Sequence, residues 1–194
     1  MDMSDLKRPK AVLLDRDGVI NFDSPDYILA PEQWHAIPGS LDAIAHLHRA
    51  GIKVAIVSNQ SGLGRGMMDR DTFNDIHAKM MLAIEQAGGF ISHVAYCPHG
   101  PDDGCVCRKP LPGMVIDSLA ALGLSGSPEE ALFIGDSIRD VEAAFAAKVP
   151  AMLVQSGYGD SEKILQRSKL LMPEIRAFAD LGAAVDAVLG EAAC

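Results

Sequence analysis

Short apolar runs alternate with amphipathic segments along most of the chain. The apolar runs have the length of buried strands and contain β-branched side chains. We predict strands at residues 10–14, 52–57, 93–96, 131–134 and 151–154. The segments between them repeat apolar residues at helical spacing. We predict helices at residues 38–50, 69–87, 112–122 and 138–147, and a short helix or strand followed by a helix within residues 173–189.

This alternation favours an α/β fold, a doubly wound parallel sheet with helices on both faces. The 194 residues are enough to bury one core. We predict a single domain over residues 1–194, because the chain has no internal repeat, low-complexity segment or linker. Residues 67–111 contain no insertion large enough for a separate cap domain.

Polar residues follow directly after four of the predicted strands. In parallel sheets, ligands bind beyond the carboxyl ends of the strands, so these residues should converge on one site. The first strand is followed by Asp15 and Asp17, the second by Ser58, Asn59, Gln60 and Ser61, the third by a loop that ends at Lys109, and the fourth by Asp136, with Asp140 one helical turn further on.

These residue types suit phosphate chemistry. Asp15, Asp17 and Asp136 would repel one another unless a cation lay among them, and oxygen ligands suit Mg²⁺. A carboxylate held in this way can attack phosphorus and form an aspartyl-phosphate. A second carboxylate two residues on can protonate the leaving oxygen and then activate water. Ser58 would bind phosphate oxygens, and Lys109 would neutralise negative charge between the nucleophile and the phosphate.

The loop after the third strand carries a second metal-binding pattern. Cys97, His99, Cys105 and Cys107 form two close pairs joined by five residues, which suits tetrahedral zinc. All four positions are filled, so the ion would be structural, and it would order a loop with little hydrophobic content. Cys194 is terminal and has no assigned role.

The ordered motifs resemble those of the haloacid dehalogenase-like (HAD) phosphatases. The matching residues are "DRDG" at 15–18, Ser58, Lys109 and "GD" at 135–136, and the resemblance is close over residues 10–155. The segments "DRDGVIN", "SNQSGLGRG", "CPHGPDDGCVCRKP" and "GDSIRD" are similar to those of members that hydrolyse heptose bisphosphates for lipopolysaccharide or surface glycans. The histidinol phosphatases are a near subgroup, and histidinol phosphate is the alternative substrate.

The resemblance implies a role for each matching residue. Asp15 would be the nucleophile and Asp17 the general acid and base, with Mg²⁺ bound by the Asp15 carboxylate, the Asp17 carbonyl and Asp136. The implied phosphate and substrate contacts are Ser58, Asn59, Gln60, Ser61, Arg108, Lys109, Asp23 and Tyr27. Arg108, and Arg65 between two glycines, are candidates for the distal phosphate of a bisphosphate, and this favours the heptose over histidinol phosphate. The sequence assigns no role to Asn21 or Ser137.

Composition restricts the partners. A net charge of −9 disfavours nucleic acid, which needs a basic surface. No apolar run reaches the ~20 residues that span a bilayer, and the first ten residues are polar, so we expect a cytoplasmic protein without a membrane partner. No spare apolar stripe is evident, which favours a monomer.

A zinc-stabilised binding module without catalysis is the alternative to an enzyme, but four intact catalytic positions argue against it.

Overall fold

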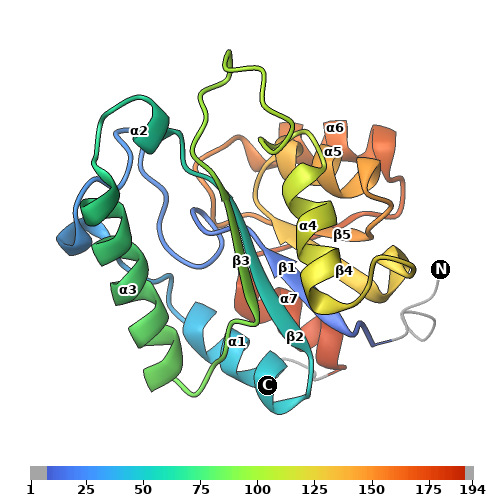
Figure 1. Ribbon diagram of the computed structural model, residues 1–194. Coiled ribbons are helices and arrows are strands. Elements are labelled where there is room, and N and C mark those ends of the chain that lie inside the picture. Colours follow the sequence, from blue (N-terminus) through green and yellow to red (C-terminus); the bar gives the residue numbers. More distant parts are fainter. Residues whose placement is uncertain (1–7, 191–194) are drawn as a thin grey trace.

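The computed structural model describes residues 8–190, so Cys194 and the first seven residues lie outside the described part (Figure 1). Its centre is a six-stranded parallel sheet in the order β3-β2-β1-β4-β5-β6. The strands are β1 (Ala11–Leu14), β2 (Lys53–Asn59), β3 (His93–Cys97), β4 (Ala131–Gly135), β5 (Ala151–Val154) and β6 (Arg176–Phe178). The helices are α1 (Ser40–Arg49), α2 (Ser61–Gly64), α3 (Arg70–Gln86), α4 (Gly113–Leu122), α5 (Ile138–Ala146), α6 (Ser161–Leu171) and α7 (Leu181–Leu189), with 3-10 turns η2 (Pro31–Gln33) and η3 (Pro128–Glu130).

The sheet is buried on both faces because its strands are apolar at successive positions. Side chains alternate between the faces, so Val12 and Leu14 of β1 lie in one core and Ala11 and Leu13 in the other. Helices α1, α3 and α7 cover the first face, and α4 and α5 cover the second (Figure 1). The predicted doubly wound α/β fold is therefore confirmed.

The predicted elements are found with ends shifted by one or two residues, but two helices were missed. Helix α2 has four residues, too few to show a helical period. Helix α6 is largely exposed and buries only Ser168, so its apolar pattern is weak. The sequence did contain a signal for the start of α6, because Asp is a preferred N-cap residue. In the structure the Asp160 side chain accepts a hydrogen bond from the Lys163 N–H. The strand and helix expected within residues 173–189 are β6 and α7.

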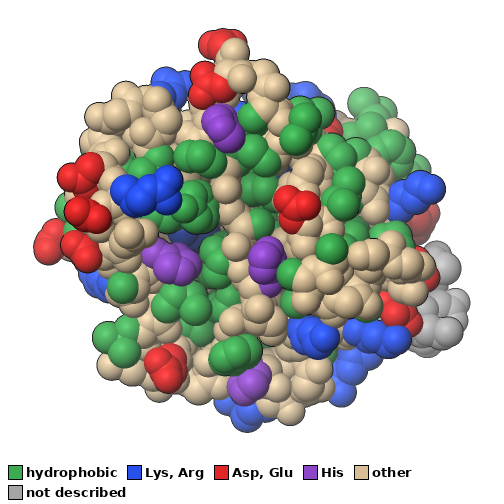
Figure 2. All heavy atoms as spheres, viewed as in Figure 1, with side chains coloured by type: hydrophobic (Ala, Val, Ile, Leu, Met, Phe, Trp, Pro, Cys, Tyr) green, Lys and Arg blue, Asp and Glu red, His purple; other side chains and the backbone are tan. Residues whose placement is uncertain are grey.

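The strand order places the predicted chemistry at one edge. Leu14 pairs with Ile56 of β2 and Ile134 of β4, so Asp15 leaves the centre of the sheet between these two strands. Within residues 8–190 no separate cap domain covers this edge, since residues 60–92 form α2, α3 and their connections, and residues 98–112 form a loop. No helix of this part of the chain is both long and apolar enough to cross a bilayer. Acidic and basic side chains are mixed over the face shown in Figure 2.

Candidate active site

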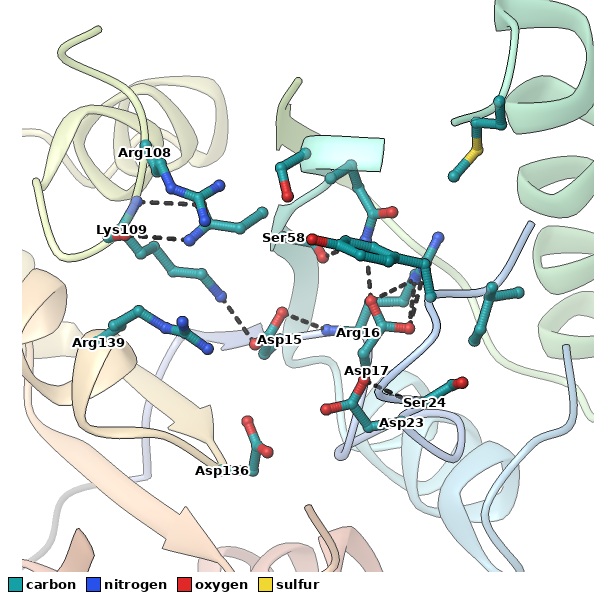
Figure 3. Close-up of a pocket in the computed structure, with 16 residues that line it drawn as sticks. Asp15, Arg16, Asp17, Asp23, Ser24, Ser58, Arg108, Lys109, Asp136 and Arg139 are labelled. Atoms are coloured by element: carbon teal, nitrogen blue, oxygen red, sulfur yellow. Dashed lines mark hydrogen bonds and ion pairs between the residues drawn. The ribbon is translucent and has the colours of Figure 1, made fainter. Parts of the chain in front are cut away.

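A pocket of about 200 Å³ lies beyond the carboxyl ends of β1, β2 and β4 (Figure 3). Its lining includes all of the residues expected at the substrate and Mg²⁺ sites except Arg65. The predicted residues in the lining are Asp15, Asp17, Asp23, Tyr27, Ser58, Asn59, Gln60, Ser61, Arg108, Lys109 and Asp136, and the further ones are Arg16, Ser24, Ile28, Met68 and Arg139.

Lys109 is the most deeply enclosed charge in the pocket wall, with only 2% of its side chain exposed. Its ammonium group contacts Asp15 Oδ2 at 2.9 Å, Asp140 Oδ1 at 2.6 Å and the Val57 carbonyl at 2.8 Å. Burial alone would lower the pKa of Lys109, but the two carboxylates outweigh it and raise the pKa. All three donors are used, so Lys109 acts first as the cation that fixes the Asp15 carboxylate.

Asp140 is a site residue that had no role in the prediction from sequence. Ser137, the N-cap of α5, donates its N–H and its hydroxyl to Asp140 Oδ2, and the other oxygen pairs with Lys109. Burial would raise the pKa of Asp140, but Lys109 outweighs it and lowers the pKa. Asp140 is therefore the counter-ion of Lys109, and Ser137 holds it in place.

Asp17 is held by three neighbours. Its oxygens accept hydrogen bonds from Arg16 Nε and a terminal nitrogen, from Asn21 Nδ2 at 2.8 Å and from Gln60 Nε2 at 2.9 Å. Burial would raise the pKa of Asp17, but the charge and hydrogen bonds of Arg16 outweigh it and lower the pKa. Asn21, which is fully buried, thus has a structural role in orienting Asp17.

Two residues that were expected to touch substrate also organise the site. Gln60 donates to Ser58 Oγ at 2.8 Å, which leaves the Ser58 hydroxyl hydrogen for another acceptor. The Asn59 side chain pairs with the backbone of Lys109, donating to its carbonyl and accepting from its N–H, each at 3.0 Å. Asn59 therefore connects the end of β2 to the loop that carries Lys109.

The carboxylates that face the pocket fit a hard divalent cation. Oxygens of Asp15, Asp136 and Asp140 lie within 4.8 Å of one another, and Asp140 is already paired with Lys109. Burial and then neighbouring negative charge raise the pKa of Asp136 to about 8. Burial, partly offset by Lys109, raises the pKa of Asp15 to about 7. A cation between Asp15 and Asp136 would relieve this repulsion, so both residues suit Mg²⁺.

Two glycines enclose the Asp136 carboxylate from behind. A Cβ on Gly157 would overlap Asp136 Oδ2, and a Cβ on Gly18 would also crowd this carboxylate. Ser156 donates its hydroxyl to the Gly18 carbonyl at 2.8 Å, which joins the loop after β5 to the loop after β1. The loop after β5 is therefore a wall of the proposed Mg²⁺ site.

The cysteine loop brings four potential zinc ligands together. Cys97 Sγ lies 3.7 Å from Cys105 Sγ and 3.3 Å from Cys107 Sγ, and His99 Nδ1 lies 3.3–3.5 Å from two of the sulfurs. Tetrahedral zinc with Zn–S bonds of ~2.3 Å sets its sulfurs about 3.8 Å apart, close to these values. No disulfide joins Cys97, Cys105 and Cys107. The Cys₃His cluster fits one zinc ion.

The structure does not bring Arg65 to the pocket. Residues 61–64 form α2, and the Gly64 N–H bonds the Pro98 carbonyl at 3.0 Å, so the chain turns toward the cysteine loop before Arg65. Arg65 itself is exposed. The pocket instead contains Arg139, at the start of α5, which sequence reasoning missed. Its position next to the Asp136 motif was the available signal.

Comparison with known proteins gives three agreeing results. Residues 19–148 match the profile of the haloacid dehalogenase-like hydrolases. The D-glycero-beta-D-manno-heptose-1,7-bisphosphate 7-phosphatase of Bordetella bronchiseptica is 47% identical over 94% of this chain and 99% of its own. The enzyme of the same name from Pseudomonas putida is 45% identical over 88% of this chain and 97% of its own length. A crystal structure of the B. bronchiseptica D,D-heptose 1.7-bisphosphate phosphatase with magnesium and phosphate has a TM-score of 0.85, over 94% of this chain and 99% of the other.

A side chain at residue 157 should displace the Asp136 carboxylate. We expect Gly157→Ala to raise the dissociation constant for Mg²⁺ by about tenfold or more. Changes to the groups that orient a metal ligand typically lower metal affinity by about this factor. Calorimetric titration without substrate measures this constant directly. Gly159→Ala is the matched control, because its Cβ would meet only the flexible end of Ile164. Equal Mg²⁺ affinity in the Gly157 variant and the parent protein would contradict this role.

The two raised pKa values predict how Mg²⁺ stabilisation depends on pH. Asp15 and Asp136 hold protons more tightly when folded than when unfolded, so without metal their contribution to stability falls as pH rises from about 4 through about 8. Mg²⁺ must displace these protons and binds better at high pH. Saturating MgCl₂ should raise the melting temperature more at about pH 8.5 than at about pH 6. Scanning calorimetry measures the rise in melting temperature, and an equal rise at the two pH values would count against the prediction.

Zinc should contribute to folding. We expect about one zinc ion per chain by elemental analysis after dialysis, in line with one Cys₃His site. Cys107→Ala should lose that metal and lower the melting temperature, because metal-binding free energy is folding free energy in such loops. Cys194→Ala, which leaves all four cluster residues unchanged, is the control and should keep both the metal and the melting temperature. A metal-free protein of unchanged stability would rule out the structural role.

Proposed function

The chain belongs to the haloacid dehalogenase-like hydrolase family and is a phosphatase, and we propose that it removes the 7-phosphate of D-glycero-β-D-manno-heptose 1,7-bisphosphate. The product, heptose 1-phosphate, would be a precursor of the heptose in lipopolysaccharide or surface glycans. The observation that carries the proposal is the Asp15 carboxylate, which Lys109 holds at 2.9 Å in a pocket that also contains Asp17 and Asp136. The names of relatives at 44–47% identity support the substrate and its β-anomer.

In the first step, an oxygen of Asp15 attacks the phosphorus, and the bond between phosphorus and the sugar oxygen breaks. Lys109 holds Asp15 in place, and Ser58 can donate its free hydroxyl hydrogen to a phosphate oxygen. Mg²⁺ bound by Asp15, Asp136 and the Asp17 carbonyl would supply charge stabilisation for the transferring phosphoryl group. Asp17 gives a proton to the leaving oxygen, so the sugar departs as an alcohol.

In the second step, Asp17 takes a proton from water, and the water oxygen attacks the phosphorus of the aspartyl-phosphate. The bond between phosphorus and Asp15 breaks, so inorganic phosphate and the Asp15 carboxylate are formed. The low pKa of Asp17 suits this base role. A phosphate dianion next to Asp17 adds negative charge and raises its pKa, which favours the protonated form that the first step needs.

We also propose a single domain over residues 1–194 that works as a cytoplasmic monomer on a small phosphorylated sugar. The net charge of −9 and the mixed charges of the visible face support a small substrate over nucleic acid (Figure 2). Gel filtration with light scattering tests the monomer.

Replacement of the nucleophile tests the reaction. Asp15→Asn should lower kcat on heptose 1,7-bisphosphate by about a thousandfold or more, because an amide cannot form the acyl-phosphate. Phosphate release measures this, and Asp71→Asn, an exposed change on α3, should retain full activity. Removal of metal with EDTA should stop turnover, and Mg²⁺ should restore it. Full activity of Asp15→Asn would overturn the nucleophile, and a higher kcat/KM on histidinol phosphate would overturn the substrate.

A further inference from the structure

The charges that line the pocket do not all have partners within the protein. Four carboxylates face four cations there, namely Asp15, Asp17, Asp23 and Asp136 against Arg16, Arg108, Lys109 and Arg139. Arg16 pairs with Asp17 at 2.8 Å, and Lys109 pairs with Asp15 at 2.9 Å. The geometry assigns Asp136 to the divalent cation. Asp23, the fourth carboxylate, forms no ion pair with Arg108 or Arg139. Both arginines can therefore meet negative charge that a ligand brings.

Arg139 lies where folding gives little reason for a cation. It is exposed in the first turn of α5, and positive charge at a helix N-terminus is unfavourable because the helix dipole is positive there. Its guanidinium forms no hydrogen bond or ion pair with any residue of the described range 8–190. Its charge does act on Asp23, where it opposes the burial that raises the pKa of that carboxyl. Arg139 is therefore directed at the pocket without a structural partner.

Arg108 is positioned differently and complements Arg139. One terminal nitrogen of Arg108 donates to the His99 carbonyl at 2.9 Å, so the cysteine loop anchors the guanidinium at the pocket wall. The other donors of this group remain for a ligand. Figure 3 shows Arg108, Lys109 and Arg139 on one side of the pocket, and Asp17 and Asp23 on the other. Two guanidinium groups thus flank the buried Lys109.

We propose that Arg139 joins Arg108, the candidate already indicated by the sequence, in binding the phosphate of the substrate that is not transferred. This inference rests on the proposed bisphosphatase function. The transferred phosphate must lie deep in the pocket, at Asp15, whereas Arg139 is exposed and can meet a second anion nearer the entrance. The planar fork of a guanidinium matches two phosphate oxygens. Arg139 thereby takes the role that the sequence pattern had offered to Arg65.

The test compares a substrate with two phosphates and one that lacks the distal phosphate. Arg139→Gln should lower the ratio of kcat/KM for heptose 1,7-bisphosphate to that for heptose 7-phosphate by about tenfold to a hundredfold, the usual effect of one charge-assisted hydrogen bond. The loss should appear mainly in KM. Arg139→Lys should restore part of the ratio, because it keeps the charge without the fork.

Inhibition gives a readout that does not depend on turnover of the bisphosphate. With heptose 7-phosphate as substrate, Arg139→Gln should raise the inhibition constant of heptose 1-phosphate, which carries only the distal phosphate. The inhibition constant of inorganic phosphate, which binds at Asp15, should stay within about twofold. Arg167→Gln, an exposed arginine of α6, and Arg65→Gln are the matched controls and should change neither constant.

The outcomes separate this inference from the function on which it rests. If the parent protein does not hydrolyse heptose 1,7-bisphosphate, the proposed function fails. If it does, and Arg139→Gln keeps the parent's substrate ratio and inhibition constants, only the role of Arg139 is overturned. Equal losses on both substrates would place Arg139 at the transferred phosphate, and a loss confined to Arg65→Gln would return the distal phosphate to Arg65.

Discussion

The buried ammonium group of Lys109 is the interaction on which the rest of the site depends. It joins the end of β1 through Asp15, the end of β2 through the Val57 carbonyl and the first turn of α5 through Asp140. A buried charge costs several kcal/mol unless it is paired, and removal of one partner of such a pair typically costs about 3–5 kcal/mol. Three segments far apart in the sequence are therefore forced to meet at one point, which is where the nucleophile stands.

The position of Lys109 depends in turn on the cysteine loop. Residues 98–112 have few apolar side chains to bury, so hydrophobic packing alone would leave this loop poorly determined. The Cys₃His cluster closes it, Arg108 bonds the His99 carbonyl, and Asn59 makes two hydrogen bonds to the backbone of Lys109. A zinc ion held by this cluster at the end of β3 would thus position Arg108 and Lys109 without touching substrate.

The sequence was most informative where chemistry and strand ends coincide. Asp15, Ser58, Lys109 and Asp136 stand at the ends of apolar runs, so a parallel sheet brings them together whatever the details of its loops. Asp140 and Arg139 were given no role because the sequence at the start of α5 is equally typical of a capped surface helix without a function. Arg65 lies outside the pocket lining because a four-residue helix turns the chain away, and such a helix leaves no period in the sequence. Asn21 could not be assigned without knowing that it is buried against Asp17.

Asp15 and Asp17 show how two identical side chains two residues apart acquire opposite properties. Burial raises the pKa of Asp15 to about 7, whereas Arg16, Asn21 and Gln60 overcome burial and lower the pKa of Asp17. A nucleophile must be ionised and a general acid must be protonated, so each shift opposes the first chemical step. A divalent cation bound next to Asp15 would lower its pKa, and a phosphate dianion next to Asp17 would raise its pKa. Binding of cation and substrate would thus shift both carboxyls toward the protonation states that the first step needs.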